Sequence, residues 1–457
     1  MNQATQIKDF TKGSITKNLI IFALPLFLAN LLQVVYNMAD MAVVGHILGK
    51  TGISAVSVGG DVTHLLTFIA MGLSNAGQVL IARYIGAGQR EKIGKFVGTM
   101  SGFLVLSALA LSAAGLIFQT ELLTLMNTPE EAFEGAVSYS SVSMAGLVFI
   151  YGYNTVSAIL RGMGDSKHPF IFIAIAAVLN VVLDLLFVIK FNMGEKGAAL
   201  ATILSQAVSF ISCVIFLVRR KKEFELTMKL KDFFVWDTEM LSALLKLGIP
   251  MAIKTASIQI SKLFVNSYIN SYGVAVSAFS GIANKIASVA NLISMAMNTA
   301  GSTVVGQNLA AGEFKRVKKV LKSLAEITTS VSTLFSVLII LFPEEIFSLF
   351  IKTTESDVLS IAKNYIPIAI LLFYGAAARA IMNALLNGSG NYKINFATAI
   401  FDGIVMRIGL TLLFGIVLNM KYYGFWLGDA IAGFTPFIIG VVFYVSGSWK
   451  KGVVNKA

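Results

Sequence analysis

Two pairs of polar residues lie within apolar stretches of this sequence and carry groups that could do chemistry. Tyr36 and Asp40 are four residues apart in one stretch, and Asn180 and Asp184 are four apart in another. Residues with this spacing share one face of a helix. An ionisable group inside an apolar span is costly and therefore indicates function. Each pair presents an acid together with a polar neighbour.

The two acids are expected to lie at a similar depth in the membrane. Both helices begin on the same side, and Asp40 and Asp184 lie near their far ends, so the two carboxylates could meet. Two carboxylates, an amide and a phenol suit a hard cation such as Na⁺. They equally suit proton exchange, because close carboxylates in a low dielectric raise one another's proton affinity. The alternative is that the acids face water separately or cap bent helices.

The second half of the sequence carries more cations than acids in its apolar stretches. Lys254, Lys285 and Arg379 lie there with Asp402 as an available partner. These charges either line a cavity that holds cargo or form buried ion pairs that fix helix packing. Because positive charge repels a cation, we expect no coupling ion in this half.

Twelve apolar stretches must position these residues. Each is long enough to cross the hydrocarbon core as a helix, which takes about 20 residues. An open chain in lipid has no other option, so the expected fold is all-α, with twelve transmembrane helices. Their bounds are 18–47, 53–82, 95–119, 137–161, 168–190, 196–218, 241–271, 277–306, 317–342, 358–387, 393–419 and 423–447.

The composition supports a membrane protein. Charged residues make up 13% of the chain and apolar residues 56%, and the mean hydropathy is +0.77, whereas a soluble domain carries about 25% charged residues. The net charge of +12 lies in short segments between apolar stretches, without a basic module with interleaved aromatics. These segments fit cytoplasmic loops, so no nucleic-acid partner is expected.

The sequence repeats itself after about 225 residues. The two copies form two six-helix lobes at 1–218 and 241–457, joined by a cytoplasmic linker at 219–240. Six spans per copy make the repeats parallel, with a pseudo-two-fold axis along the membrane normal. The matching positions are Pro25 with Pro250, Gly49 with Gly273, Gly88 with Gly312, Leu160–Lys167 with Leu386–Lys393, and Gly197 with Gly424.

The distribution of Lys and Arg predicts the orientation. With a cytoplasmic N-terminus, 24 of these residues fall in inside segments and five in outside segments. The positive-inside rule then places both termini in the cytoplasm.

No catalytic constellation accompanies these spans. Gly162-Met163-Gly164-Asp165 matches the GxGD pattern of intramembrane aspartyl proteases, but it falls in a short loop, and its repeat, Gly388–Asn391, lacks the acid. A duplicated turn explains both copies. The sequence contains no nucleophile–base pair, metal-ligand set or Walker A motif, so we expect neither an enzyme nor an ATP-driven pump.

In these features the chain resembles the multidrug and toxic compound extrusion (MATE) transporters over its whole length. The resemblance is greatest to the DinF-like type and implies that Pro25 bends the first helix. It also implies that a cation-coupling site is formed by Tyr36, Asp40, Asn180, Asp184 and Thr202. The NorM type instead has acids in spans seven and ten, where this chain has Ile258, Gln259 and Ala376. The matching motifs are Pro25, Asp40–Gly45, Gly86–Gln89, Arg161–Asp165 and Asn180–Asp184.

The resemblance implies a secondary antiporter that exports organic, often cationic, compounds in exchange for H⁺ or Na⁺ by alternating access. It implies no cofactor beyond the coupling ion, which Asp40 and Asp184 would bind if it is Na⁺. We expect a monomer in the plasma membrane that contacts lipids and small organic substrates. The alternative is a lipid-linked saccharide flippase of the same superfamily, which the basic residues Lys254, Lys285 and Arg379 would favour.

Overall fold

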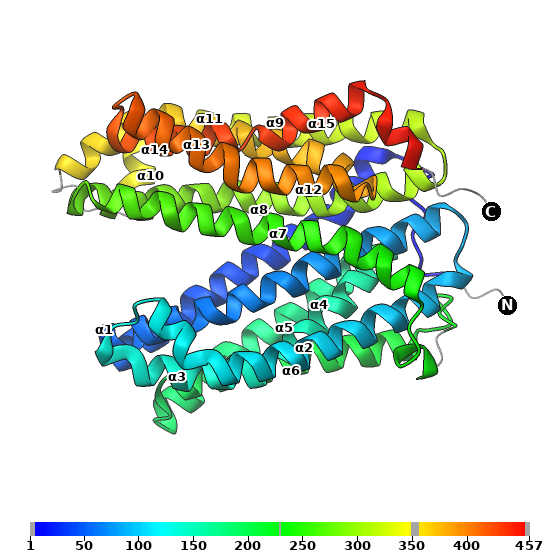
Figure 1. Ribbon diagram of the computed structural model, residues 1–457, viewed down its shortest axis with the longest axis horizontal. Coiled ribbons are helices and arrows are strands. Elements are labelled where there is room, and N and C mark those ends of the chain that lie inside the picture. The colour runs from blue at the N-terminus through cyan, green and yellow to red at the C-terminus, as the bar shows by residue number, and fades with distance from the viewer. Residues whose placement is uncertain (1–4, 228–229, 349–355, 453–457) are drawn as a thin grey trace. The chain divides into compact units, whose positions relative to one another are not determined.

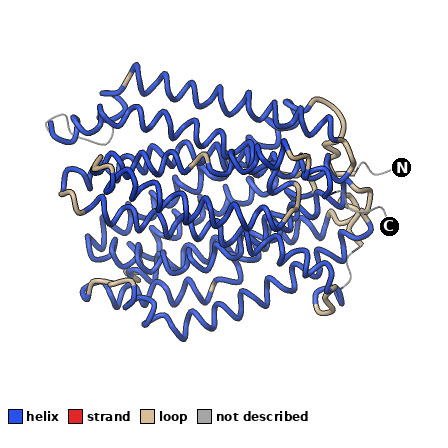
Figure 2. Tube along the Cα trace, turned by 45° about the horizontal axis from the view of Figure 1, so that its top comes forward, coloured by secondary structure: helices blue, strands red, loops and turns tan. Residues whose placement is uncertain are grey.

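The computed structural model describes residues 5–227, 230–348 and 356–452, and these form helices with no strand among them (Figure 2). The first half contains α1 (Ile15–Gly86), α2 (Glu91–Leu125), α3 (Glu130–Ala145), α4 (Leu147–Gly162), α5 (Lys167–Asp184), the π-helix η1 (Leu185–Lys190), α6 (Gly194–Arg219) and the 3₁₀ turn η2 (Leu230–Phe233). The second half contains α7 (Thr238–Asn270), α8 (Val274–Ala310), α9 (Phe314–Leu341), α10 (Pro343–Ser348), α11 (Ser356–Gly388), α12 (Tyr392–Ile400), the π-helix η3 (Phe401–Met406), α13 (Arg407–Leu412), the π-helix η4 (Leu413–Val417), α14 (Lys421–Ala432), α15 (Thr435–Val445) and the 3₁₀ turn η5 (Ser448–Gly452).

The described helices supply the twelve spans expected from the sequence. Ten helices are long and apolar enough to cross a membrane, and the pair α3–α4, bent by 47°, adds an eleventh span. The 72 residues of α1 would measure about 108 Å as one helix, far more than the roughly 30 Å of hydrocarbon. Gly49, with φ 65° and ψ −158°, divides α1 into two spans. The all-α prediction is confirmed.

The internal repeat is visible in the backbone angles. Residues with left-handed φ recur in pairs at the same places in the two halves, as at Gly88 (φ 74°) and Gly312 (φ 77°). The other pairs are Gly49 with Gly273, Gly164 with Gly390, Asn192 with Asn419, and Gly194 with Lys421. Because such angles are rare outside turns, their recurrence shows that the two halves share one fold.

The second half contains one residue more than the first in the segment between Gly390 and Asn419. The spacing is 226 residues between Gly164 and Gly390, and it is 227 between Asn192 and Asn419. The π-helix η3 lies in this interval and has no counterpart in the first half, where α5 is regular up to Asp184. A π turn is wider than an α turn and commonly lies at functional sites. The extra residue is thus accommodated inside the helix rather than in a loop.

The chain forms two compact units, and each takes one helix end from the other half of the sequence. The first unit comprises residues 1–9 and 24–252, and the second comprises residues 10–23 and 253–457. The exchanged ends are the beginnings of α1 and α7, drawn in blue and green in Figure 1. Pro25 and Pro250 lie within two residues of the changes of unit. This division by contacts differs from the lobe boundaries expected from the sequence, which stay a prediction.

The beginning of α1 is held in the second unit by polar and aromatic contacts. The backbone N–H of Phe10 donates to Gln307 Oε1 at 2.9 Å, and Asn308 Nδ2 donates to the Phe10 carbonyl at 3.2 Å. Within the segment, the rings of Phe10 and Phe22 pack at a tilt, with 5.2 Å between their centroids. The segment 10–23 therefore belongs physically to the helices of the second half.

Each unit has its own apolar core, and each exposes apolar residues on its outer helices. The first core includes Phe96, Tyr151 and Leu160, and the second includes Phe279, Tyr365 and Trp426. Val178 and Val182 on α5 remain more than half exposed. A soluble protein would bury such a surface, whereas lipid covers it without cost.

The left-handed position shared by Gly194 and Lys421 generates a prediction. Lys421 has φ 55° where its repeat partner Gly194 has φ 56°, and nothing lies within 4 Å of a Cβ built at Gly194. A residue with a side chain costs about 1–2 kcal/mol in this conformation. Glycine avoids that cost, but it loses more conformational entropy on folding, which offsets part of the gain. We expect Lys421→Gly to stabilise the protein by about 0.5–1 kcal/mol and Gly194→Ala to destabilise it similarly, in thermal unfolding in detergent. Lys421→Ala is the control, and a gain from alanine equal to that from glycine would contradict the explanation.

Candidate functional site

Four buried oxygens without a hydrogen-bond donor meet in the first unit. Asp40 is 8% exposed, Asn180 2% and Asp184 0%. The carboxyl groups of Asp40 and Asp184 interact electrostatically with one another. Among the described residues, Asp40 Oδ1, Asn180 Oδ1 and both carboxylate oxygens of Asp184 have no hydrogen-bond partner. A buried acceptor without a donor is costly, so this arrangement requires a proton or a cation between the oxygens.

Three helices position these groups. Asp40 lies on the first span of α1, Asn180 and Asp184 lie one turn apart at the end of α5, and Thr202 lies on α6. Asn180 Nδ2 donates to Thr202 Oγ1 at 3.4 Å, which links α5 to α6 at this site. The π-helix η1 begins at the residue after Asp184. The residues expected to form one site from the sequence are therefore brought together, and their role stays a prediction.

Tyr36 completes the expected set on the same helix as Asp40. Gln33 Nε2 donates to Tyr36 Oη at 3.4 Å, and Tyr36 also interacts with Asp40 and Gln206. A small pocket beside the acids is lined by Tyr36, Ala176, Ala177, Asn180, Thr202, Ser205 and Gln206. The pocket gives these polar groups a common space.

Two further residues belong to this site and were missed in the sequence. Tyr139 on α3 is buried and interacts electrostatically with Asp40 and Asp184. Gln206 follows Thr202 by one turn on α6, and this spacing was a signal that could have identified it. Nothing in the sequence around Tyr139 distinguishes it from other aromatic residues of the spans.

The second unit contains a different polar cluster, which we call the basic cluster. Its members are Lys254, Lys262, Arg379, Asp402, Arg407 and Asp429. Arg407 is 1% exposed and forms ion pairs with both acids, through Nη2 to Asp402 Oδ1 at 3.3 Å and through Nη1 to Asp429 Oδ1. Lys254 Nζ donates to Asn383 Oδ1 at 2.6 Å.

The structure brings together three of the four cavity charges expected in this half. Lys254, Arg379 and Asp402 interact electrostatically with one another. Lys285 is exposed on α8, and in the described part of the chain none of the interactions of the basic cluster involves it. Any cavity role of Lys285 is thus separate from that of the other three.

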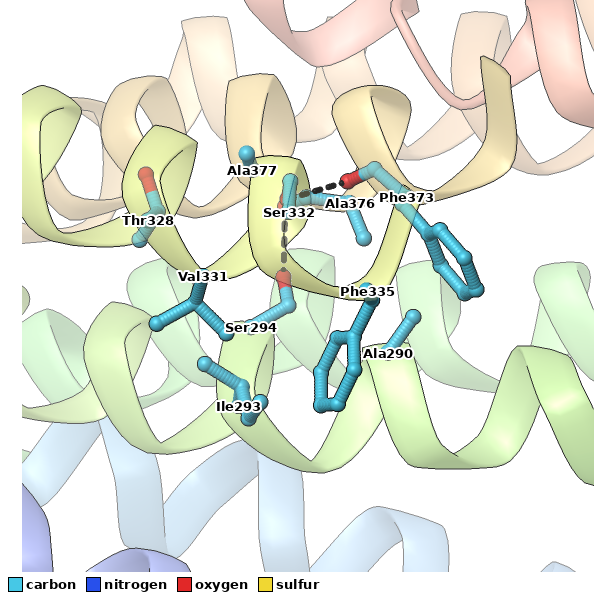
Figure 3. Close-up of a pocket in the computed structure, with 10 residues that line it drawn as sticks. All are labelled: Ala290, Ile293, Ser294, Thr328, Val331, Ser332, Phe335, Phe373, Ala376 and Ala377. Carbon is cyan, nitrogen blue, oxygen red and sulfur yellow. Dashed lines mark hydrogen bonds between the residues drawn. The ribbon is translucent and has the colours of Figure 1, made fainter. Parts of the chain in front are cut away.

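Ala376, at a position near the acid of the NorM type, lines a small pocket in the second unit (Figure 3). Ser332 Oγ donates to the Phe373 carbonyl at 2.9 Å, and Ser294 Oγ donates to the Ala376 carbonyl at 2.8 Å. Alanine, phenylalanine, valine and isoleucine side chains form the remaining walls with Thr328. None of the lining residues is titratable, so this pocket offers a coupling cation no charge.

Asp165 of the GxGD pattern caps a helix. Asp165 Oδ1 accepts from the backbone N–H groups of Lys167 and His168 at 3.1 Å, and Oδ2 contacts His168 Nδ1 at 2.5 Å. Asn391, in the repeat copy, accepts from the N–H of Ile394 at 3.3 Å and caps α12 in the same way. Both residues satisfy helix N-termini. The motif is accounted for by this turn.

Comparisons with known proteins indicate the family of the chain. The family model described as MatE matches residues 25–186 and 250–420. The chain is 29% identical to the probable multidrug resistance protein YpnP of Bacillus subtilis, covering 97% of both chains. It is 26% identical to the probable multidrug resistance protein NorM of Thermotoga maritima, covering 96% of this chain and 94% of the relative.

Solved structures share the fold. A MOP superfamily transporter from Pyrococcus furiosus, described as having a binding pocket of reverse polarity that suggests a different function, superposes with a TM-score of 0.90 at 23% identity, covering 98% of this chain and 100% of that chain. An outward-facing multidrug resistance MATE family transporter superposes with a TM-score of 0.88 at 24% identity, with the same coverage. At these identities the likeness concerns the fold alone.

Because the carboxylates of Asp40 and Asp184 interact, we expect their mutual repulsion to lower the thermal stability of the protein when no cation is bound. Replacing Asp184 by asparagine removes one charge and supplies N–H donors to the unpartnered oxygens. We expect Asp184→Asn to stabilise the purified protein by about 1–3 kcal/mol in Na⁺-free neutral buffer, measured by thermal unfolding. Glu131→Gln, at an exposed acid on α3, should leave the melting temperature unchanged. A lower melting temperature for Asp184→Asn would contradict the geometry.

Proposed function

Because the chain belongs to the multidrug and toxic compound extrusion (MATE) family, we propose that it exports organic compounds by antiport with H⁺ or Na⁺. A multidrug efflux transporter of this family is a multi-pass membrane protein and not an enzyme. The proposal concerns what drives the transport and which residues couple it.

The observation that carries the proposal is the set of unpartnered buried oxygens on Asp40, Asn180 and Asp184. Without a cation, two carboxylates face one another in a low dielectric, which is unfavourable. A proton or Na⁺ entering from outside relieves this cost. Binding energy available in this way can drive a change of conformation, because a ligand shifts an equilibrium by its difference in affinity for the two states.

Alternating access is proposed to use the bends of the first helix of each half. Pro25 in α1 and Pro250 in α7 lie next to the points where these helices change unit. Proline removes a helical hydrogen bond and allows the helix to bend. Pro25 lies fifteen residues before Asp40 on the same span, so neutralising Asp40 could alter the bend through the helix.

The protein is proposed to act as a monomer in the plasma membrane, with both termini in the cytoplasm. The distribution of Lys and Arg supports this orientation. The subtype most similar to this chain in its first-lobe acids is the DinF-like one. A lipid-linked saccharide flippase is not favoured, because the relatives named above are multidrug resistance proteins.

Transport by reconstituted protein tests the coupling. We expect uptake of a fluorescent organic cation into inside-out vesicles to follow either an imposed pH gradient or an imposed Na⁺ gradient, and Asp40→Asn and Asp184→Asn to lose at least tenfold in initial rate. The loss follows because each variant leaves the ion site short of charge.

The control is Glu131→Gln, which removes an exposed acid of the same unit. Each variant is compared at equal amounts of folded protein, judged by its melting temperature. Full gradient-driven transport by both asparagine variants would refute the site. Transport that follows neither gradient would refute the antiport itself.

A further inference from the structure

The basic cluster carries more positive charge than its own acids neutralise. Four cations and two carboxylates leave a formal surplus of two positive charges. Arg407 forms ion pairs with both Asp402 and Asp429. Among the described residues, Lys254, Lys262 and Arg379 form no ion pair with a carboxylate, and Arg379 Nε is buried without a partner. The surplus therefore lies on these three side chains.

Uncompensated cations in an apolar lobe are expensive. A charge in the span region has to be paired, solvated or functional. Asn383 Oδ1 accepts from Lys254 at 2.6 Å but brings no negative charge. Lys254, Lys262 and Arg379 are half-buried, and Arg407 Nε is buried without a partner among the described residues. An anion would supply the missing charge.

The repeat places two members of the basic cluster, Arg407 and Asp429, at positions equivalent to residues of the carboxylate site. The spacing of 227 residues that relates Asn192 to Asn419 also relates Asn180 to Arg407 and Thr202 to Asp429. The hydrogen bond from Asn180 to Thr202 corresponds to the ion pair from Arg407 to Asp429. Asp184 corresponds to Thr411, which has no charge. At these equivalent positions the second copy carries a guanidinium, at Arg407, and its acid is at Asp429 instead of at the position of Asp184.

We propose that the basic cluster binds the carboxylate or phosphate group of an exported amphiphilic anion. Arg379 presents a planar guanidinium, which matches the geometry of carboxylate and phosphate oxygens. Lys254 and Lys262 are eight residues apart on α7, about 12 Å along the helix, so they bind an extended or multiply charged head group rather than a single small ion. This inference rests on the proposed export function, and it names the cargo class.

Binding to the purified transporter in neutral detergent, without any gradient, tests the inference. The probes are fluorescein, a xanthene dye with anionic groups, and rhodamine 6G, a cationic dye on the same ring system, both followed by fluorescence polarisation. We expect fluorescein to bind more tightly, with an affinity that falls as salt rises. Lys254→Gln/Arg379→Gln should weaken fluorescein binding at least tenfold, whereas the conservative Arg379→Lys should retain part of it.

Lys285→Gln removes an exposed cation outside the basic cluster and is the matched control, with fluorescein binding expected to be unchanged. The titrations use no gradient, so a failure of ion coupling and a failure of this inference are distinguishable. Preferential binding of rhodamine, or unchanged fluorescein binding by a folded double variant, would overturn the proposal.

The lipid environment distinguishes the two sources of an anionic group. The same titrations are made in nanodiscs of phosphatidylcholine alone and of phosphatidylcholine with phosphatidylglycerol. Equal fluorescein affinity in both supports exported cargo as the occupant. A tenfold loss of affinity with phosphatidylglycerol would assign the site to a lipid phosphate and overturn the cargo assignment.

Discussion

Buried charge in an apolar helix bundle must be compensated, and this constraint governs the whole arrangement of polar residues in the protein. In the first unit it leaves Asp40 and Asp184 facing one another with oxygens that no donor reaches. In the second it pairs Arg407 with two acids, while Lys254, Lys262 and Arg379 have no ion pair within the described part of the chain. Because lipid cannot solvate these groups, we propose that each imbalance is relieved by something that the protein binds.

The two imbalances have opposite sign on one repeated framework. α5 with α6, and α13 with α14, place equivalent residues opposite one another, as Asn180 opposite Thr202 and Arg407 opposite Asp429. A duplicated fold can keep its backbone while its copies diverge in charge, since a few substitutions change what a site binds. In our proposals, ion coupling and cargo recognition are separate tasks of the two copies.

Much of the fold could be predicted from the sequence, because long apolar stretches and paired turn glycines determine spans and repeat. The pairing of Asp40 with Asp184 was also predictable, since spacing and depth placed both acids. Tyr139 was not, because its approach to the acids depends on how α3 packs. The π-helix η3 could not be predicted either, because one extra residue leaves the hydropathy of its apolar stretch unchanged. The separation of Lys285 from Arg379 required the side-chain positions.

The exchanged helix ends make the order of synthesis matter. The first unit includes the opening of α7, so its core stays incomplete until the ribosome has made residue 252. Residues 10–23 are made first, yet they find their packing partners only when α8 and α9 follow. Neither half-chain is a self-sufficient folding module, although each is a copy of the other. Cutting the chain between α6 and α7 would give two fragments that complete their cores only when they associate.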